Sequence, residues 1–150
     1  MKWILKKFSD LTTDELHDVL QLRINVFVVE QDCPYNEVDG KDKIAHHLLG
    51  FNYKNEIIAY TRIFKPGDYY KQAAFGRVVV HNEYRNQKIG YDLVNKTILE
   101  MKRLFGNVDI KIGGQTYLKK FYKSFGFKQI GEGYIEDGIP HIFMVLETDQ

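Results

Sequence analysis

The stretch that decides the fold is Phe75-Gly-Arg-Val-Val-Val-His-Asn-Glu-Tyr-Arg-Asn-Gln-Lys-Ile-Gly90, which continues into Tyr91-Asp-Leu-Val-Asn-Lys-Thr97. The β-branched run at 78–80 is typical of a buried strand. The polar turn after it carries Arg85, and the apolar spacing that follows favours a helix. A strand that enters a helix through such a turn directs free backbone N–H groups and the positive end of the helix dipole at one point. We therefore predict an anion-binding site there, of a kind that suits a pyrophosphate.

Patterns before this stretch predict a strand, a helix and a hairpin. Residues 3–8 favour an opening strand, and Thr12 and Glu15 form a capping box at the start of a helix. Residues 30–42 break the helical pattern and read as a polar, acidic loop. Residues 48–53 and 57–63 favour two strands of a hairpin.

Patterns after it predict a second half of alternating helices and strands. A helix is expected over 87–104, ended by Gly106, and then a short strand over 108–112. Gly113-Gly114 is interpreted as a break, and Thr116 as the cap of a shorter helix that runs to 125. Strands at 127–135 and 141–147 join through Asp137-Gly138, a favourable hairpin dipeptide. The order is β-α-(loop or α)-β-β-β-α-β-α-β-β, a mixed α/β arrangement.

Length and composition indicate one globular domain over residues 1–150. The chain is 44% hydrophobic and 27% charged with a net charge of +1, so nothing favours nucleic acid or an anionic membrane as a partner. No apolar run approaches the roughly 20 residues that span a bilayer. The lone cysteine, Cys33, fits a reducing compartment, and a cytoplasmic location is expected. His46 and His47 are neighbours on a strand, so one surface and one buried histidine are expected rather than a metal site.

Four blocks of sequence resemble one family. Arg85-x-x-Lys88-x-Gly90 resembles the Gln/Arg-x-x-Gly-x-Gly/Ala signature of the GCN5-related N-acetyltransferases (GNAT). The segment from Gln115 through Tyr122 to Gly126-Phe127 is similar to their Asn-x-x-Ala-x-x-x-Tyr-x-x-x-Gly-Phe motif, and blocks 22–40 and 134–141 resemble the ElaA-like subgroup. The resemblance covers nearly the whole chain. It implies an α/β GNAT fold: a central mixed sheet of about six to seven strands, splayed at the cofactor site and flanked by helices.

The resemblance also implies an activity: acetyl transfer from acetyl-coenzyme A to a primary amine by direct attack on the thioester, without a metal. The acceptor is an unidentified small molecule or peptide, and a homodimer stays open. The cofactor-binding residues implied are Val78, Val79, Val80, Arg85, Asn86, Gln87, Lys88, Ile89, Gly90, Tyr91, Gln115 and Tyr122.

Two departures from the family pattern bear on cofactor binding. Lys88 stands where the family usually has glycine; at a positive φ it costs about 1 kcal/mol of strain, and otherwise its ammonium can contact phosphate. Gln115 replaces the common asparagine, so its hydrogen bond to the cofactor arm is left open.

Tyr122 is expected to serve the departing thiolate as a general acid or hydrogen-bond donor. The alternative is that it only belongs to the apolar face of a short helix. The acceptor ammonium must also lose a proton, and the candidate bases are Glu30, Glu37, Asp39 and His141. A carboxylate from 30–39 acting through water is favoured, with His141 as a substrate contact or alternate base; deprotonation by bulk water is the remaining alternative.

Two rival functions fit the same sequence. One is a non-catalytic module that senses or sequesters coenzyme A, and the other is a dimeric interaction domain with a vestigial cleft. Retention of Tyr122 and of a polar, acidic rim favours catalysis over both.

Overall fold

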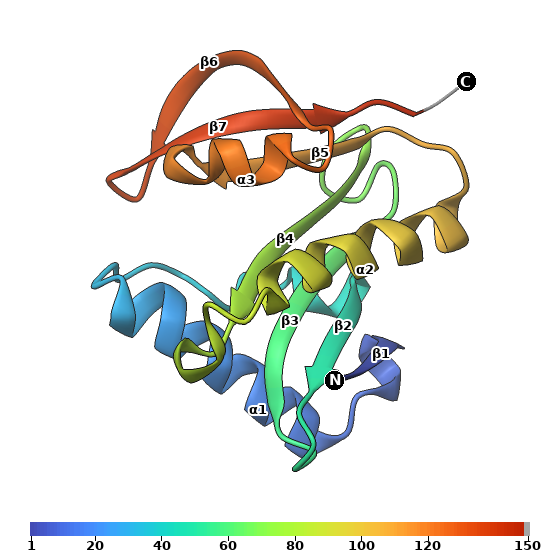
Figure 1. The fold of residues 1–150 in the computed structure, drawn as a ribbon, viewed down its shortest axis with the longest axis vertical. Helices are drawn as coiled ribbons and strands as arrows, with labels where there is room; N and C mark the ends of the chain where they lie inside the picture. The colour runs from blue at the N-terminus through green and yellow to red at the C-terminus, as the bar shows by residue number, and fades with distance from the viewer. Residues whose placement is uncertain (149–150) are drawn as a thin grey trace.

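The computed structural model describes residues 1–148, which form a seven-stranded mixed sheet flanked by helices (Figure 1). The strands lie in the order β1-β2-β3-β4-β5-β7-β6, and every neighbouring pair is antiparallel except β4 and β5. Their bounds are β1 Lys2–Lys7, β2 His46–Phe51, β3 Ile57–Phe64, β4 Ala73–Val80, β5 Ile110–Gln115, β6 Lys128–Glu136 and β7 Ile139–Leu146. The predicted mixed sheet is confirmed.

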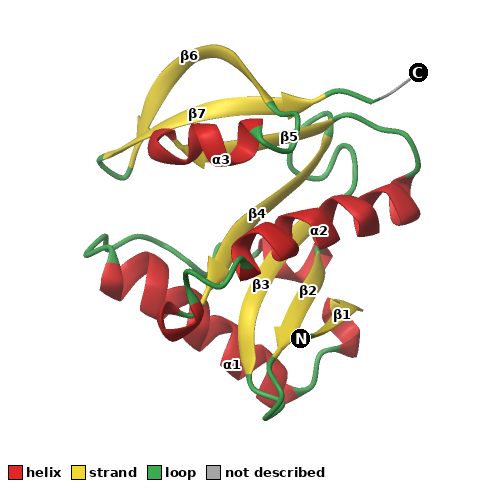
Figure 2. Ribbon diagram, in the orientation of Figure 1, coloured by secondary structure: helices red, strands yellow, loops and turns green. Residues whose placement is uncertain are grey.

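Two long helices cover opposite faces of this sheet (Figure 2). The helices are α1 Thr13–Ile24, α2 Ile89–Phe105 and α3 Lys119–Lys123. Adjacent residues of β2 separate the two faces: Leu49 packs with the α1 residues Val19 and Leu22, whereas Leu48 packs with the α2 residue Leu93. The alternation of side chains along a strand therefore creates one core layer under each helix.

The start of α1 confirms the predicted capping box. The Thr12 hydroxyl accepts a hydrogen bond from the Glu15 N–H, and the Glu15 carboxylate accepts one from the Thr12 N–H. Beyond Ile24 the helix does not stop but widens into a π-helix, Asn25–Glu30. Such widened turns are rare and occur frequently at functional sites. The π-helix ends at Glu30, whose carboxylate meets Arg85 in the turn after β4.

The sheet opens between its two parallel strands. β4 and β5 pair only at Ala73 with Ile110 and at Ala74 with Lys111. Beyond this short contact β4 runs away from β5, as the diverging arrows in Figure 1 show. The predicted splay is confirmed, and it leaves the second half of β4 without a strand on that side.

A bulge bends β4 inside this opening. On β3, Tyr60 pairs with Val79 and Arg62 pairs with Gly76, so Arg77 and Val78 together oppose one residue. Arg77 has φ +53°, in the left-handed region that non-glycine residues rarely adopt. Bulges of this kind leave the extra residue unpaired and redirect the strand.

Two expectations for the second half of the chain are wrong. Gly113-Gly114 does not break the chain but lies within β5, where a Cβ on Gly113 would come within 2.6 Å of the Tyr134 hydroxyl. The glycines are needed for close packing of tyrosines rather than for a turn. Thr116 does not cap α3: it begins a 3-10 turn, and Leu118 precedes α3 without a side-chain cap.

Other local predictions are confirmed. Asp137 and Gly138, with φ +50° and +77°, form the turn between β6 and β7. His47 is fully buried and His46 is half-buried, as the alternation on a strand requires. Within residues 1–148 no helix is long and apolar enough to cross a membrane.

Candidate active site

The splay between β4 and β5 forms a cleft of about 840 Å³. Its walls are the diverging halves of the two strands, the end of the π-helix, the segment 33–39 and the β6–β7 turn. Six of the predicted cofactor-binding residues line the cleft: Val78, Val79, Val80, Arg85, Gln115 and Tyr122. The remaining predicted ones, Asn86, Gln87, Lys88, Ile89, Gly90 and Tyr91, follow in the turn that leads from β4 into α2 and are outside the walls of the cleft.

The turn into α2 presents unpaired backbone donors. The first hydrogen bond into the helix runs from Asp92 N to Lys88 O, and within the described part of the chain the N–H groups of residues 88–91 have no acceptor. α2 has 17 residues, so its dipole adds positive potential at the same place. The arrangement suits a bound anion.

Lys88 adopts the left-handed conformation at this turn. Its φ of +63° is the geometry that glycine favours, so the residue carries the strain expected for a lysine at a positive φ. Gly90 follows one residue into the helix, and a Cβ built there would meet only Val80 Cγ2, at 3.9 Å. The protein itself therefore leaves space beside Gly90.

Arg85 is held by a carboxylate in this structure. Its guanidinium forms a two-pronged ion pair with Glu30, with Nη2 at 2.8 Å from Oε2, and its Nε donates to the Val80 carbonyl. Hydrogen bonds from Arg85 lower the pKa of Glu30. The pair joins the end of the π-helix to the predicted anion site.

Tyr122 reaches the cleft from α3. Its side chain is only 5% exposed, and its ring lies against Gly114, where a Cβ would come within 3.2 Å of Cε2. Burial raises the pKa of the phenol well above its ordinary value. Among residues 1–148 the hydroxyl has no hydrogen-bond partner. A buried, protonated phenol without a partner on the wall of a cleft is available as a donor.

Gln115, at the end of β5, bridges to the opposite wall. Its Nε2 donates to Gln31 Oε1 over 3.2 Å, across the cleft from the residue after the π-helix. The Gln115 side chain therefore lies at the cleft, where it is hydrogen-bonded to protein.

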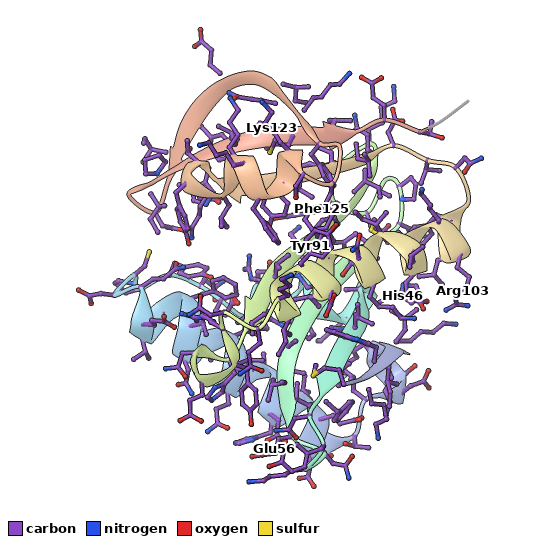
Figure 3. The ribbon with its side chains drawn as sticks, in the orientation of Figure 1. His46, Glu56, Tyr91, Arg103, Lys123 and Phe125 are labelled. Atoms are coloured by element: carbon purple, nitrogen blue, oxygen red, sulfur yellow. The ribbon has the colours of Figure 1, made fainter. Side chains whose placement is uncertain are left out.

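Tyr91 has a structural contact that the sequence did not suggest. Its ring packs on Phe125 with centroids 4.8 Å apart, and Figure 3 shows the two side chains meeting between α2 and the segment after α3. This contact joins the two halves of the molecule on the α2 face of the sheet.

Two of the candidate bases belong to a buried ionic cluster that sequence reasoning missed. Glu37 lies between Arg23 Nε, at 3.1 Å, and Arg77 Nε, at 2.7 Å. Asp39 accepts two hydrogen bonds from Arg62. Although burial alone would raise the pKa of Asp39, the bonds from Arg62 lower it to about 2. No sequence signal marks these pairs, because the partners are 14 to 40 residues apart.

His141 is the candidate base that has no strong ion pair. It lines the cleft at the start of β7, beside Gln115 on β5. Its Nδ1 is 2.7 Å from the Ile139 carbonyl, which can only accept, so Nδ1 carries the proton in the neutral ring. Nε2, with Glu136 Oε2 at 3.7 Å, then keeps a free lone pair. Within the described residues no group of three or more His, Cys, Asp or Glu side chains is arranged to hold a metal.

This chain belongs to the GNAT acetyltransferase family: the model of the acetyltransferase (GNAT) domain matches residues 14–148. It is 40% identical to protein ElaA of Escherichia coli K12, over 100% of this chain and 99% of that protein. The resemblance to the ElaA-like subgroup is thereby confirmed.

Solved structures agree. The crystal structure of E. coli ElaA has a TM-score of 0.90 and covers 97% of this chain and 99% of its own. An acyl-CoA N-acyltransferase from Pseudomonas aeruginosa is 39% identical with a TM-score of 0.91, over 96% of this chain and 97% of that one. An aminoglycoside 6′-N-acetyltransferase complexed with coenzyme A shares the fold at 15% identity and a TM-score of 0.71, over 95% of each chain. Fold and family support acetyl-CoA-dependent acetyl transfer as the general activity.

Proposed function

We propose that this protein transfers the acetyl group of acetyl-coenzyme A to a primary amine of a small molecule or peptide. The observation that carries the proposal is the cleft itself: a splayed parallel strand pair that leads to a helix start with unpaired N–H groups, with an unpartnered phenol on its wall. The family, and a distant structural neighbour complexed with coenzyme A, support the choice of donor. The lone Cys33 is consistent with a cytoplasmic location.

The residues at the cleft fit the donor in two places. The N–H groups of 88–91 supply hydrogen bonds for a pyrophosphate, and the guanidinium of Arg85, which Glu30 holds in the free protein, supplies a cation beside them. The exposed edge of β4 at Val78–Val80, which has no strand partner on that side, supplies backbone groups for the pantetheine arm. Acetyl-coenzyme A, when bound there, supplies an activated thioester carbonyl.

The protein then contributes position and charge stabilisation. Both reactants meet in one cleft, which replaces a bimolecular encounter by an oriented one. A backbone N–H at the β4 bulge, near Val78, stabilises the oxyanion that forms on the thioester carbonyl. Tyr122 donates its phenolic proton, or a hydrogen bond, to the departing thiolate. The raised pKa of the Tyr122 phenol keeps this donor protonated until then.

The structure favours His141 over the carboxylates as the group that removes the proton from the acceptor. Glu30 and Asp39 are ion-paired with lowered pKa values, and Glu37 lies between two arginines. His141 presents a free Nε2 to the cleft, and the lone pair of a neutral imidazole can accept a proton there. A carboxylate acting through water remains the alternative proposal.

The test is to mix the protein with acetyl-coenzyme A and a panel of amines and to follow the free thiol. The panel spans amino sugars, polyamines, amino acids and peptide N-termini, and an amine-free reaction measures hydrolysis. Acceptor-dependent thiol release above hydrolysis supports the proposal. Coenzyme binding without such release for any amine would instead support a non-catalytic coenzyme A module.

A further inference from the structure

The β4 bulge is strained at Arg77. The residue has φ +53° in the middle of a strand, although it has a Cβ and a long side chain. Strained residues of this kind persist only where their surroundings hold them. The strain lies beside Val78, at the point where the proposed function needs an oriented backbone N–H.

The side chain of Arg77 is held by Glu37 and Tyr35, and Asp39 Oδ2 lies a further 3.7 Å from its Nη2. Glu37 Oε2 lies 2.7 Å from Arg77 Nε, an electrostatic contact in which the N–H is not aligned for a hydrogen bond. The Tyr35 ring lies 5.6 Å from the guanidinium carbon, and the Tyr35 hydroxyl donates to the same Glu37 oxygen over 3.1 Å. We call Arg77, Glu37 and Tyr35 the Arg77 clamp.

The clamp is anchored in the protein core. Arg23, which is fully buried, donates from Nε to Glu37 Oε1 and from Nη2 to the Glu37 carbonyl. Through Nη1 it also binds Asp42, which Arg62 of β3 binds as well. Glu37 is therefore fixed to α1 and β3 independently of Arg77, so it can hold Arg77 against the strain.

We propose that Glu37 is a positioning residue: through Arg77 it fixes the β4 bulge and thereby the backbone N–H that faces the thioester. The inference rests on the proposed acetyl transfer. It gives Glu37 a role different from that of a base, since both of its carboxylate oxygens are engaged by donors or a cation from the protein.

The test uses glycine at position 77, because glycine adopts positive φ without steric cost. We compare kcat for Glu37→Gln in the natural background and in the Arg77→Gly background. If the clamp restrains the bulge, Glu37→Gln lowers kcat about tenfold in the natural background but less than about twofold in the Arg77→Gly background. The KM for acetyl-coenzyme A stays within about twofold in both backgrounds.

An equal loss of kcat in both backgrounds would overturn the proposal, because a residue that acts as the base behaves in this way. No loss of kcat in either background would overturn it as well.

Backbone hydrogen exchange at residues 77–79 gives a readout that needs no activity: exchange is expected to accelerate in Glu37→Gln, and unchanged exchange contradicts the clamp. If Glu37→Gln does not fold, Tyr35→Phe, which removes only one hydroxyl, is expected to show a smaller change in the same direction. Failure of the wild type to release thiol would reject the proposed function while leaving the exchange result to judge the clamp.

Discussion

Tyr122 is the residue on which the proposed chemistry depends most. Tyr122→Phe keeps the ring that packs against Gly114 and removes only the hydroxyl, which has no hydrogen-bond partner among residues 1–148. We expect kcat to fall by about 10²-fold while the melting temperature stays close to wild type. Tyr53→Phe, on an 86% exposed side chain outside the walls of the cleft, is the control and keeps full turnover. Near-normal turnover of Tyr122→Phe, where chemistry limits the rate, would make the tyrosine a packing residue only.

His141 can be distinguished from the carboxylates by pH profiles. We expect kcat/KM of the wild type to rise with pH along an acidic limb, because the base must be unprotonated to accept the acceptor's proton. His141→Gln is expected to lose this limb, and Glu30→Gln, Glu37→Gln and Asp39→Asn to keep it. Loss of the limb in one of the carboxylate variants would move the role to that residue, and four parallel profiles would assign the proton to bulk water.

Single residues of the site differ in how far the sequence predicts them. The sequence predicts that Tyr122, Arg85 and His141 belong to the site, because each lies in a block that resembles the family. All three line the cleft. The partners of Glu37 and Asp39 were not predictable, since charges in a polar segment usually face solvent and only the tertiary fold brings Arg23 and Arg62 to them.

At the scale of elements, the segment that follows the π-helix is attached by ion pairs, and this has a consequence for acid stability. The pKa of Asp39 is about 2 in the folded protein against 3.8 ordinarily. A lowered pKa means that the stabilisation is present above about pH 4 and is lost as pH falls toward 2, up to about 2 kcal/mol.

Chemical unfolding between about pH 5 and pH 2, a range that brackets the two pKa values, tests this loss of stability. Asp39→Asn is expected to be less stable at pH 5 and to depend less on pH through this window. Asp32→Asn, an exposed residue of the same segment, is the control. Parallel pH curves for wild type and Asp39→Asn would contradict the assignment.

The turn into α2 carries a strain that a substitution relieves. Lys88→Gly is expected to raise the free energy of unfolding by up to about 1 kcal/mol, because φ is +63° there. Lys102→Gly, within α2, is the contrasting variant and is expected to lower it by a similar amount. Urea unfolding measures both, and destabilisation by Lys88→Gly would mean that the lysine side chain makes a compensating contact.

Elements were predicted where their signals are local. The Thr12 capping box and the Asp137-Gly138 turn depend on a few neighbouring residues, and both are confirmed. The break predicted at Gly113-Gly114 is wrong because a glycine pair signals a turn locally, whereas here it makes room for tyrosines from distant segments. The π-helix has no local signature that separates it from a continued α-helix.

At the scale of the whole molecule, one property of the sheet is decisive: β4 and β5 pair at two positions and then separate. That separation creates the cleft and places the start of α2, with its unpaired N–H groups, at one end. The order of elements along the sequence was enough to predict this splay by resemblance. The side chains that fasten the walls across it, such as Gln31 with Gln115, follow only from the folded structure.

The thermal stability of wild type and Gly90→Leu with coenzyme A tests most directly whether the coenzyme binds in this cleft. Space around Gly90 in the free protein lets a side chain fit, so the variant is expected to fold and to lose only the close approach of a ligand to the helix start. Asn95→Leu, which adds the same side chain at an exposed position of α2, is the control. At about 100 times the dissociation constant, we expect coenzyme A to stabilise wild type and Asn95→Leu by roughly 2.7 kcal/mol and Gly90→Leu by little at that concentration. If coenzyme A stabilised all three proteins equally, or did not stabilise the wild type, the result would contradict the placement of the coenzyme in this cleft.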